Sequence, residues 1–211
     1  YYDRVIEINL SQVEPAINGP MSPDAMMPLS DVAKIAKEKG FPTQLEVALI
    51  GSCTNSSYED ITRAASVAKQ IVEKGIEFKT PLLVVPGSVR IYETLKRDGV
   101  LQYFEKLNAT VLADACGPCI GQWKRTIGDS TKPNAIIESF NRNFAGRNDG
   151  SKKTNAFLAS PEIVMAMAIA GDLTFNPLKG TFKAADGTNY QLKAPKGEEL
   201  PKKGFVKEVK G

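Results

Sequence analysis

The stretch LEVALIGSCTNSSYED, residues 45–60, decides the fold class of this chain. It opens with an apolar run from Leu45 to Ile50, and it ends in a polar segment where Ser56 and Glu59 stand three residues apart, the spacing of a helix capping box. A short strand that is apolar throughout, followed by a capped helix, is typical of a parallel sheet covered on both faces. We therefore expect a strand followed by a helix that ends at Gly75.

The same alternation of strand and helix signals continues along the chain. Apolar runs predict further strands at residues 81–85, 110–113 and 135–138. Capping residues predict helices from Ser30 to Gly40, from Ser88 to about Arg97, and from Ser160 to Gly171. Strands that alternate with helices indicate an α/β domain, here a three-layer α/β/α arrangement around a mostly parallel sheet.

The two ends of the chain depart from this pattern. Val5 to Leu10 alternates like a strand, and the Pro-rich stretch 14–28 is typical of an irregular loop. Two short runs around Asp186-Gly187 predict a small hairpin, and the Lys-, Pro- and Gly-rich end from Ala194 predicts a linker. The chain lacks an initial Met and opens directly into a strand-like run, so we expect it to be a piece of a longer protein.

Composition excludes several classes of protein. The chain has 211 residues, of which 42% are hydrophobic and 24% charged, a balance that argues against disorder. Its net charge of +3 is too small to indicate a nucleic-acid partner, and no apolar run approaches the roughly 20 residues that cross a bilayer. With three Cys and no His, a disulfide framework is not expected, and an intracellular setting is favoured.

The three cysteines follow predicted strands. Cys53 comes just after one strand, Cys116 comes just after another, and Cys119 completes a Cys-Gly-Pro-Cys sequence. The carboxyl ends of parallel strands form the edge where open α/β sheets bind ligands. Three thiolates could hold three irons of a cubane cluster, which would leave the fourth iron open for Lewis-acid chemistry on a substrate oxygen. Spacing alone leaves other interpretations open: a core cysteine, a redox-active pair, or a zinc site completed by Asp114.

A polar segment, NRNFAGRNDG at residues 141–150, follows the fourth predicted strand. Its two arginines, Arg142 and Arg147, suit a multiply charged carboxylate, because guanidinium groups bind carboxylates bidentately and stay charged at any relevant pH. The alternative is a solvated loop whose Asn and Gly residues only make turns. Next to a metal site, binding of a substrate anion is the better hypothesis.

At these residues the sequence resembles the aconitase family, in particular the mitochondrial and bacterial aconitate hydratases. The matching blocks are residues 50–60 (IGSCTNSSYED), 85–88 (VPGS), 115–123 (ACGPCIGQW), 141–150 (NRNFAGRNDG) and 159–163 (ASPEI). They cover nearly the whole chain in the order of the family, and together they are highly specific.

The resemblance implies a fold and a chemistry. It implies the iron–sulfur domain of the family, in which a [4Fe–4S] cluster would be held by Cys53, Cys116 and Cys119. Substrate carboxylates would be bound by Arg142 and Arg147, with Asn141 close to the cluster. The implied reaction interconverts citrate and isocitrate through cis-aconitate, with the open iron polarising the leaving hydroxyl.

The resemblance also implies that much of the catalytic machinery lies elsewhere. No catalytic base or proton relay of the family appears in this chain, so the chain alone is expected to be inactive and to need the remaining domains as partners. Residues 1–180 would form the iron–sulfur domain, and residues 1–13 could belong to the edge of a preceding domain. Residues 181–211 would form a hairpin and a linker toward a final domain. The implied compartment is the mitochondrial matrix in a eukaryote or the cytoplasm in a bacterium.

Three alternative functions stay open. Isopropylmalate isomerase and homoaconitase share the fold and cluster, although we expect Cys-x-Met-Cys there in place of Cys-Gly-Pro-Cys. A thioredoxin-like redox module would use Cys116 and Cys119 but leaves Cys53 unexplained. An RNA-binding regulator, a role of some cytosolic aconitases, would need a basic and aromatic stripe that the sequence lacks.

Overall fold

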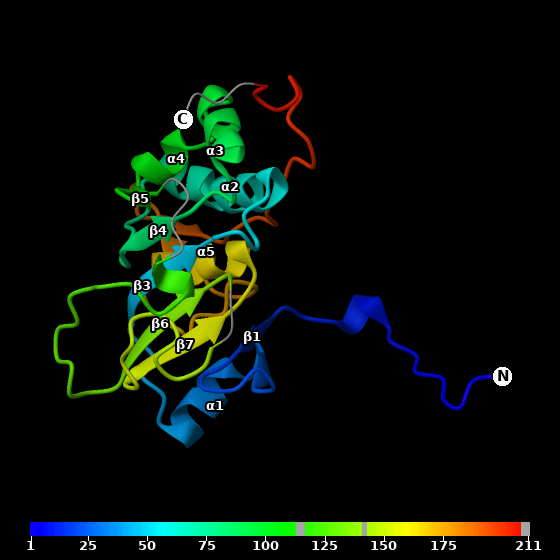
Figure 1. Ribbon diagram of the computed structural model, residues 1–211, viewed down its shortest axis with the longest axis vertical. Coiled ribbons are helices and arrows are strands. Elements are labelled where there is room, and N and C mark those ends of the chain that lie inside the picture. The colour runs from blue at the N-terminus through cyan, green and yellow to red at the C-terminus, as the bar shows by residue number, and fades with distance from the viewer. Residues whose placement is uncertain (113–116, 141–142, 208–211) are drawn as a thin grey trace.

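The computed structural model describes residues 1–112, 117–140 and 143–207 (Figure 1). Its helices are α1 (Val32–Lys39), α2 (Tyr58–Lys74), α3 (Val89–Arg97), α4 (Gln102–Glu105) and α5 (Pro161–Ala170). The strands of the main sheet are β1 (Ala16–Asn18), β2 (Met26–Pro28), β3 (Leu45–Ile50), β4 (Leu82–Val84), β5 (Thr110–Val111), β6 (Asn134–Glu138) and β7 (Thr154–Leu158). Two 3₁₀ turns, η1 (Leu10–Gln12) and η2 (Gly117–Cys119), and a hairpin of β8 (Phe182–Lys183) and β9 (Asn189–Tyr190) complete the elements.

The main sheet has seven strands in the order β2-β1-β7-β6-β3-β4-β5. The five strands from β7 to β5 pair in parallel, and β1 and β2 add an antiparallel edge. This confirms the predicted α/β class, and the arrangement is compatible with three layers. The central parallel strands β3 and β6 are buried, which explains their short apolar sequences.

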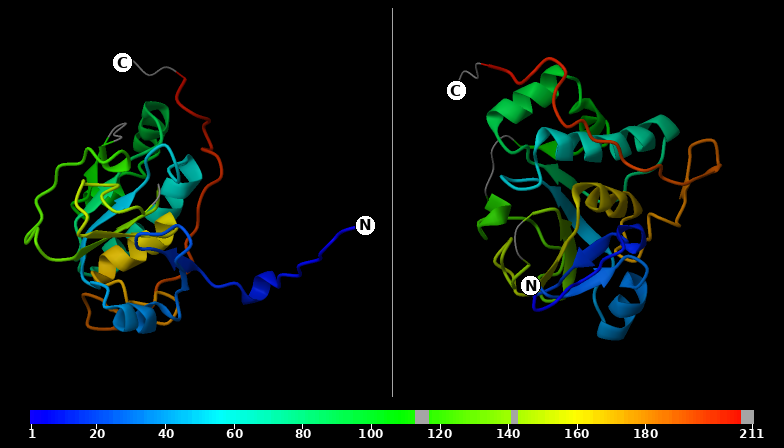
Figure 2. Two further views of the ribbon diagram at one scale, coloured as in Figure 1. Left: turned by 60° about the horizontal axis from the view of Figure 1, so that its bottom comes forward. Right: turned by 90° about the vertical axis from the view of Figure 1, so that its right-hand side faces the viewer.

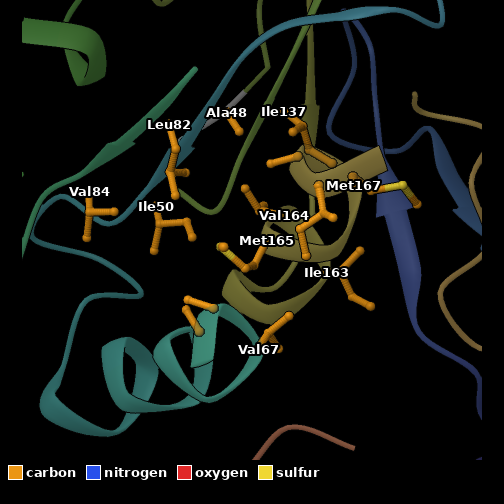
Figure 3. Packing of buried hydrophobic residues seen from close by; sticks show 14 of the residues in the cluster. Ala48, Ile50, Val67, Leu82, Val84, Ile137, Ile163, Val164, Met165 and Met167 are labelled. Carbon is orange, nitrogen blue, oxygen red and sulfur yellow. The ribbon is translucent and has the colours of Figure 1, made fainter. Parts of the chain in front are cut away.

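Alternate residues of the central strands enter two separate cores. On one face, Ala48, Ile50 and Ile137 pack against α2 and α5, as Figure 3 shows. Helices α2 and α5 lie side by side over this face (Figure 2). On the other face, Leu49 and Ile136 belong to a smaller core covered in part by the segment that carries Cys119 and Trp123.

The helix boundaries agree with the sequence at most ends. Helices α1, α2 and α5 end at Gly40, Gly75 and Gly171, each in the left-handed conformation that glycine adopts without steric cost. Helix α3 begins after Ser88 and ends at Arg97, as predicted, and the Ser88 hydroxyl caps it by accepting from the Ile91 amide. Strands β4 and β6 confirm two further predictions, and β5 confirms the start of the run at 110–113, of which residue 113 lies outside the described residues.

Two predicted N-caps were wrong. The capping box of α2 is formed by Ser57 and Asp60, one residue later than predicted, because the hydroxyl of Ser56 turns inward and donates to the Ser52 carbonyl. At α1, Asp31 is the N-cap residue in place of Ser30, whose hydroxyl donates to Glu14 Oε1 at 2.6 Å.

The N-terminal predictions also need correction. Val5 to Leu10 forms no strand, and its apolar side chains are exposed on a segment that projects from the domain (Figure 1). A strand needs a partner for its backbone groups, and the described residues offer none there. The predicted loop at 14–28 instead contains β1 and β2, which add to the sheet edge beside β7.

The C-terminal hairpin is confirmed, with its turn at Asp186 and Gly187. The segment beyond it runs along α2, where three side chains about one turn apart accept hydrogen bonds from its backbone amides. The bonds are Lys193 N to Gln70 Oε1 (2.8 Å), Lys196 N to Ser66 Oγ (2.9 Å) and Glu198 N to Thr62 Oγ1 (2.8 Å). Its role as a linker stays a prediction. Within the described residues, every helix is too short or too polar to span a membrane.

Candidate functional site

The site lies where the chain leaves β3 and β6, which are neighbours in the sheet. From β3 the chain continues to β4, and from β6 it continues to β7, and these two strands lie on opposite sides of the central pair. Neighbouring strands whose connections diverge in this way leave a crevice outside their carboxyl ends, the usual ligand site of open α/β sheets.

Gly51 shapes the exit from β3. Its φ is +82°, and a Cβ at this position would lie 2.2 Å from the carbonyl oxygen of Val85, so a side chain cannot be accommodated. The amide of Gly51 donates to Ser139 Oγ at 2.9 Å, which joins the exit of β3 to the exit of β6. The turn then carries the chain outward to Cys53.

Cys53 is exposed, and its Sγ lies 3.8 Å from Thr54 Oγ1. Two residues on, Asn55 adopts a left-handed φ of +51° and donates from Nδ2 to the Ser139 carbonyl at 2.5 Å. Cys53 is therefore carried by a loop that is hydrogen-bonded to the end of β6 on both sides of the thiol.

Cys119 ends the 3₁₀ turn η2 and is half-buried against the smaller core. The turn is closed by backbone hydrogen bonds from Ile120 and Gln122 to the Gly117 carbonyl, at 3.3 and 3.0 Å. Cys116, the third predicted ligand, lies outside the described residues, as does Asp114. Among the described residues, no group of three or more His, Cys, Asp or Glu could hold a metal ion.

The arginine segment leaves the end of β6. Arg147 is exposed, and in the described part of the chain it takes part in no ion pair. Its neighbour Asn148 is only 2% exposed and donates from Nδ2 to Glu138 Oε2 at 2.5 Å and to the Pro118 carbonyl at 3.2 Å. Asn141 and Arg142 lie outside the described residues.

Glu138, the last residue of β6, was not predicted as part of the site. Its side chain is fully buried, and burial raises the pKa of the carboxyl to about 8, against the lowering effects of the Asn148 hydrogen bond and the Arg147 charge. Near neutral pH the group is therefore mostly an uncharged acid. In sequence it appears only as a charged residue closing an apolar strand, and its burial depends on the segments that cover it.

A second cluster, around Arg125, braces the far side of the arginine segment. Arg125 Nε donates to Asp149 Oδ2 at 2.8 Å, and its other nitrogens donate to Glu46 Oε2 (2.6 Å) and Asn134 Oδ1 (2.5 Å). The guanidinium also lies over the ring of Trp123, 5.5 Å from its centre. Asp149, next to Asn148, is thus fixed by a buried ion pair that no local sequence pattern predicts.

A hollow of 340 Å³ opens at the same strand ends. Its lining includes Asn55, Ser139 and Ser160, and it is bounded on one side by β1. The fold and site together define an open, mostly parallel α/β domain in which two segments are tied to the end of β6. One is the thiol loop after β3, and the other is the Cys119 turn joined to the loop of an exposed arginine.

Comparison with known proteins identifies the class. The sequence matches the model of the aconitase family (aconitate hydratase) over residues 1–171, and the chain belongs to this family. It is 53% identical over 204 residues to the mitochondrial aconitate hydratase of Gracilaria gracilis, an alignment that covers 97% of this chain and 26% of that protein.

Other relatives give the same result. A probable mitochondrial aconitate hydratase of Dictyostelium discoideum is 53% identical over 205 residues, covering 97% of this chain and 27% of that protein. The mitochondrial aconitate hydratase of Saccharomyces cerevisiae is 50% identical over 204 residues, an alignment that covers 97% of this chain and 26% of that protein. The chain therefore spans about a quarter of the length of these relatives.

Proposed function

We propose that this chain is the cluster-binding part of an aconitate hydratase, which interconverts citrate and isocitrate. The observation that carries the proposal is that three candidate segments are joined, directly or through Asn148, to the end of one strand, β6. The Cys53 loop is bonded through Ser139, and the Cys119 turn and the Arg147 loop are bonded through Asn148 and Glu138. This supports a shared site for thiol ligands and an anion-binding arginine.

The residues present fit an iron–sulfur cluster held by Cys53, Cys116 and Cys119. Thiolates are the ligands such clusters take, and the absence of His from the whole chain argues against the common mixed Cys and His zinc site. Cys53 is exposed on the turn that follows Gly51, which supports a role as a ligand over one as a core residue. When bound, a cluster with three protein ligands supplies an open iron that acts as a Lewis acid.

The chain's own polar residues would bind the substrate. Arg147 is exposed and keeps its charge available for a carboxylate, because the buried carboxyl beside it, Glu138, is mostly uncharged near neutral pH. Arg142 would bind a second carboxylate, and Asn141 would add hydrogen bonds beside the cluster. A fork of N–H donors suits these contacts better than the single ammonium of lysine.

The rest of the reaction requires residues that this chain does not supply. Dehydration needs a base at the neighbouring carbon within hydrogen-bond reach of its proton. We infer that the base and the proton relay belong to the remaining domains, which also close over the strand ends. The names of the relatives support the mitochondrial matrix as the compartment.

Reconstitution of the isolated chain tests the cluster. Anaerobic incubation with iron and sulfide should give visible absorbance and about four irons and four sulfides per chain. Cys53→Ser and Cys119→Ser should each lower the iron content, while Ile120→Val, beside Cys119, should not. Full iron content in Cys53→Ser would refute the ligand assignment. A chain that takes up no iron but cycles between dithiol and disulfide would favour the redox-module alternative.

An activity assay tests the division of labour between domains. The reconstituted chain is mixed with isocitrate, and cis-aconitate is followed by its ultraviolet absorbance. We expect no turnover from the chain alone, with turnover restored only in the full-length protein. Turnover by the chain at the rate of an intact aconitase would show that the base lies within these residues.

A further inference from the structure

One side chain, Asn148, joins the turn that carries Cys119 to the sheet. A side-chain amide has two N–H hydrogens, and Asn148 uses Nδ2 to reach both Glu138 Oε2 and the Pro118 carbonyl. Pro118 immediately precedes Cys119. The other hydrogen bonds given above for this turn are internal, from Ile120 and Gln122 to Gly117.

A second contact places the same two segments together. Gly121 adopts a φ of +76°, and a Cβ at this position would lie 3.4 Å from the Arg147 carbonyl oxygen and 3.5 Å from that of Gly146. The backbone after Cys119 therefore packs directly on the backbone that carries Arg147. Asn148 fixes this arrangement from the buried side.

The anchor of Asn148 is Glu138, which is fully buried at the end of β6. One carboxyl oxygen accepts from Asn148, and the other has no partner in the described part of the chain. Because burial keeps this carboxyl mostly uncharged near neutral pH, it anchors the amide without neutralising Arg147.

We propose that Asn148 is a positioning residue for Cys119, holding the turn Gly117–Cys119 at a fixed place relative to Arg147, with Glu138 as its anchor. The proposal rests on the proposed function only in taking Cys119 as a cluster ligand. Its consequence is that one buried amide sets the relative positions of a metal-binding thiol and the loop of a substrate-binding arginine.

Three variants separate the two hydrogen bonds. Asn148→Asp keeps the shape of the side chain but replaces both N–H donors by an acceptor, so the bond to the Pro118 carbonyl is lost, and the contact with Glu138 survives only where the protonated Glu138 carboxyl donates to the new carboxylate. Glu138→Gln keeps an oxygen that accepts from Asn148, so both bonds survive. The double variant Glu138→Gln/Asn148→Asp holds the contact at position 138 with reversed polarity at any pH, because the new amide on β6 donates to the new carboxylate without needing a carboxyl proton. It does not restore the bond to Pro118, whose carbonyl still lacks a donor.

The readout is the alkylation rate of each thiol in the full-length protein after removal of any cluster, followed by mass spectrometry that resolves individual cysteines. Asn148→Asp should speed alkylation of Cys119 about five- to tenfold, the effect of one lost buried hydrogen bond on a local opening, and leave Cys53 unchanged. Glu138→Gln should leave both rates unchanged. Asn155→Asp is the control, since Asn155 Nδ2 also donates to two oxygens, the carbonyls of Asn134 and Lys153, at the end of β7 away from the site.

The double variant distinguishes positioning from a general structural role. Its melting temperature should recover toward that of the original protein, while Cys119 should stay as reactive as in Asn148→Asp. Three outcomes would overturn the proposal. They are recovery of both the melting temperature and the original Cys119 alkylation rate in the double variant, an unchanged Cys119 rate in Asn148→Asp, and an equal rise in the alkylation rate of Cys53. If Asn148→Asp does not fold, Asn148→Ser makes the same comparison, because its hydroxyl is too short to reach both partners.

A holoprotein measurement completes the test. Loss of visible absorbance in air should be faster in Asn148→Asp than in Glu138→Gln, and equal rates would contradict the proposal. The thiol rates need no cluster. A protein that binds no iron would therefore refute the proposed function, while the thiol rates would still decide the role of Asn148.

Discussion

The buried carboxyl of Glu138 makes a specific prediction about how stability depends on pH. Its pKa is raised from 4.5 to about 8, mainly because burial disfavours the charged form. Below pH 4.5 the group is protonated in both the folded and the unfolded chain. Between pH 4.5 and about 8 only the unfolded chain releases the proton, so the free energy of unfolding falls as the pH rises. Above about pH 8 both states are ionised, and the loss is complete.

The size of the effect follows from the shift. Each pH unit in this window costs up to about 1.4 kcal/mol, so the whole shift corresponds to at most about 5 kcal/mol. Glu138→Gln carries no charge at any pH and keeps an acceptor for Asn148. We therefore expect the variant to match the original chain near pH 5 and to be several kcal/mol more stable near pH 9.

The assay is chemical denaturation of the cluster-free chain followed by circular dichroism, from about pH 5 to about pH 9. The contributions of the other titrating groups largely cancel when the variant is subtracted from the original chain. Glu105→Gln, on the exposed side of α4, is the matched control and should not change the pH dependence. Parallel stability curves for Glu138→Gln and the original chain would refute the argument from burial.

Three further predictions concern the segments around the site. Arg125→Met should lower the free energy of unfolding by about 3 kcal/mol, because it leaves Asp149 buried without its charge partner. Lys132→Met, which breaks an exposed ion pair, should lower it by less than about 0.5 kcal/mol, and the denaturation midpoints of the two variants test this difference. Gly51→Ala should lower both the melting temperature and the cluster content, since its Cβ would clash with Val85; unchanged values would contradict this account of the turn. Arg147→Lys in the full-length enzyme should lower kcat/KM by about 10- to 100-fold, and an unchanged ratio would reject its role in substrate binding.

The sequence determined the elements that depend on neighbours along the chain. Apolar runs located β3, β4 and β6, and glycines marked the ends of α1, α2 and α5, because burial of a whole strand and left-handed caps leave local signals. The cysteine and arginine motifs likewise located the candidate site at strand ends, where Cys53 and Arg147 lie in the structure. The same motifs carried the family resemblance that the comparisons confirmed.

Other features depended on contacts between distant residues. Strands β1 and β2 formed in a Pro-rich stretch because the edge of β7 offered backbone partners, while the more strand-like run at Val5 to Leu10 stayed unpaired in the described chain. β7 itself has only a short apolar run and is recognised by its parallel pairing with β6.

The tertiary structure alone decided the chemistry of the polar groups. Glu138 and Arg125 look like ordinary charged residues in sequence, yet one is fully buried and the other is almost so. Their surroundings come from other parts of the chain: Asn148 contacts Glu138, and Glu46 and Asp149 bind Arg125. Because the cost of burying a charge depends on everything that excludes water around it, no local pattern could predict which carboxyl would hold its proton or which arginine would be fixed.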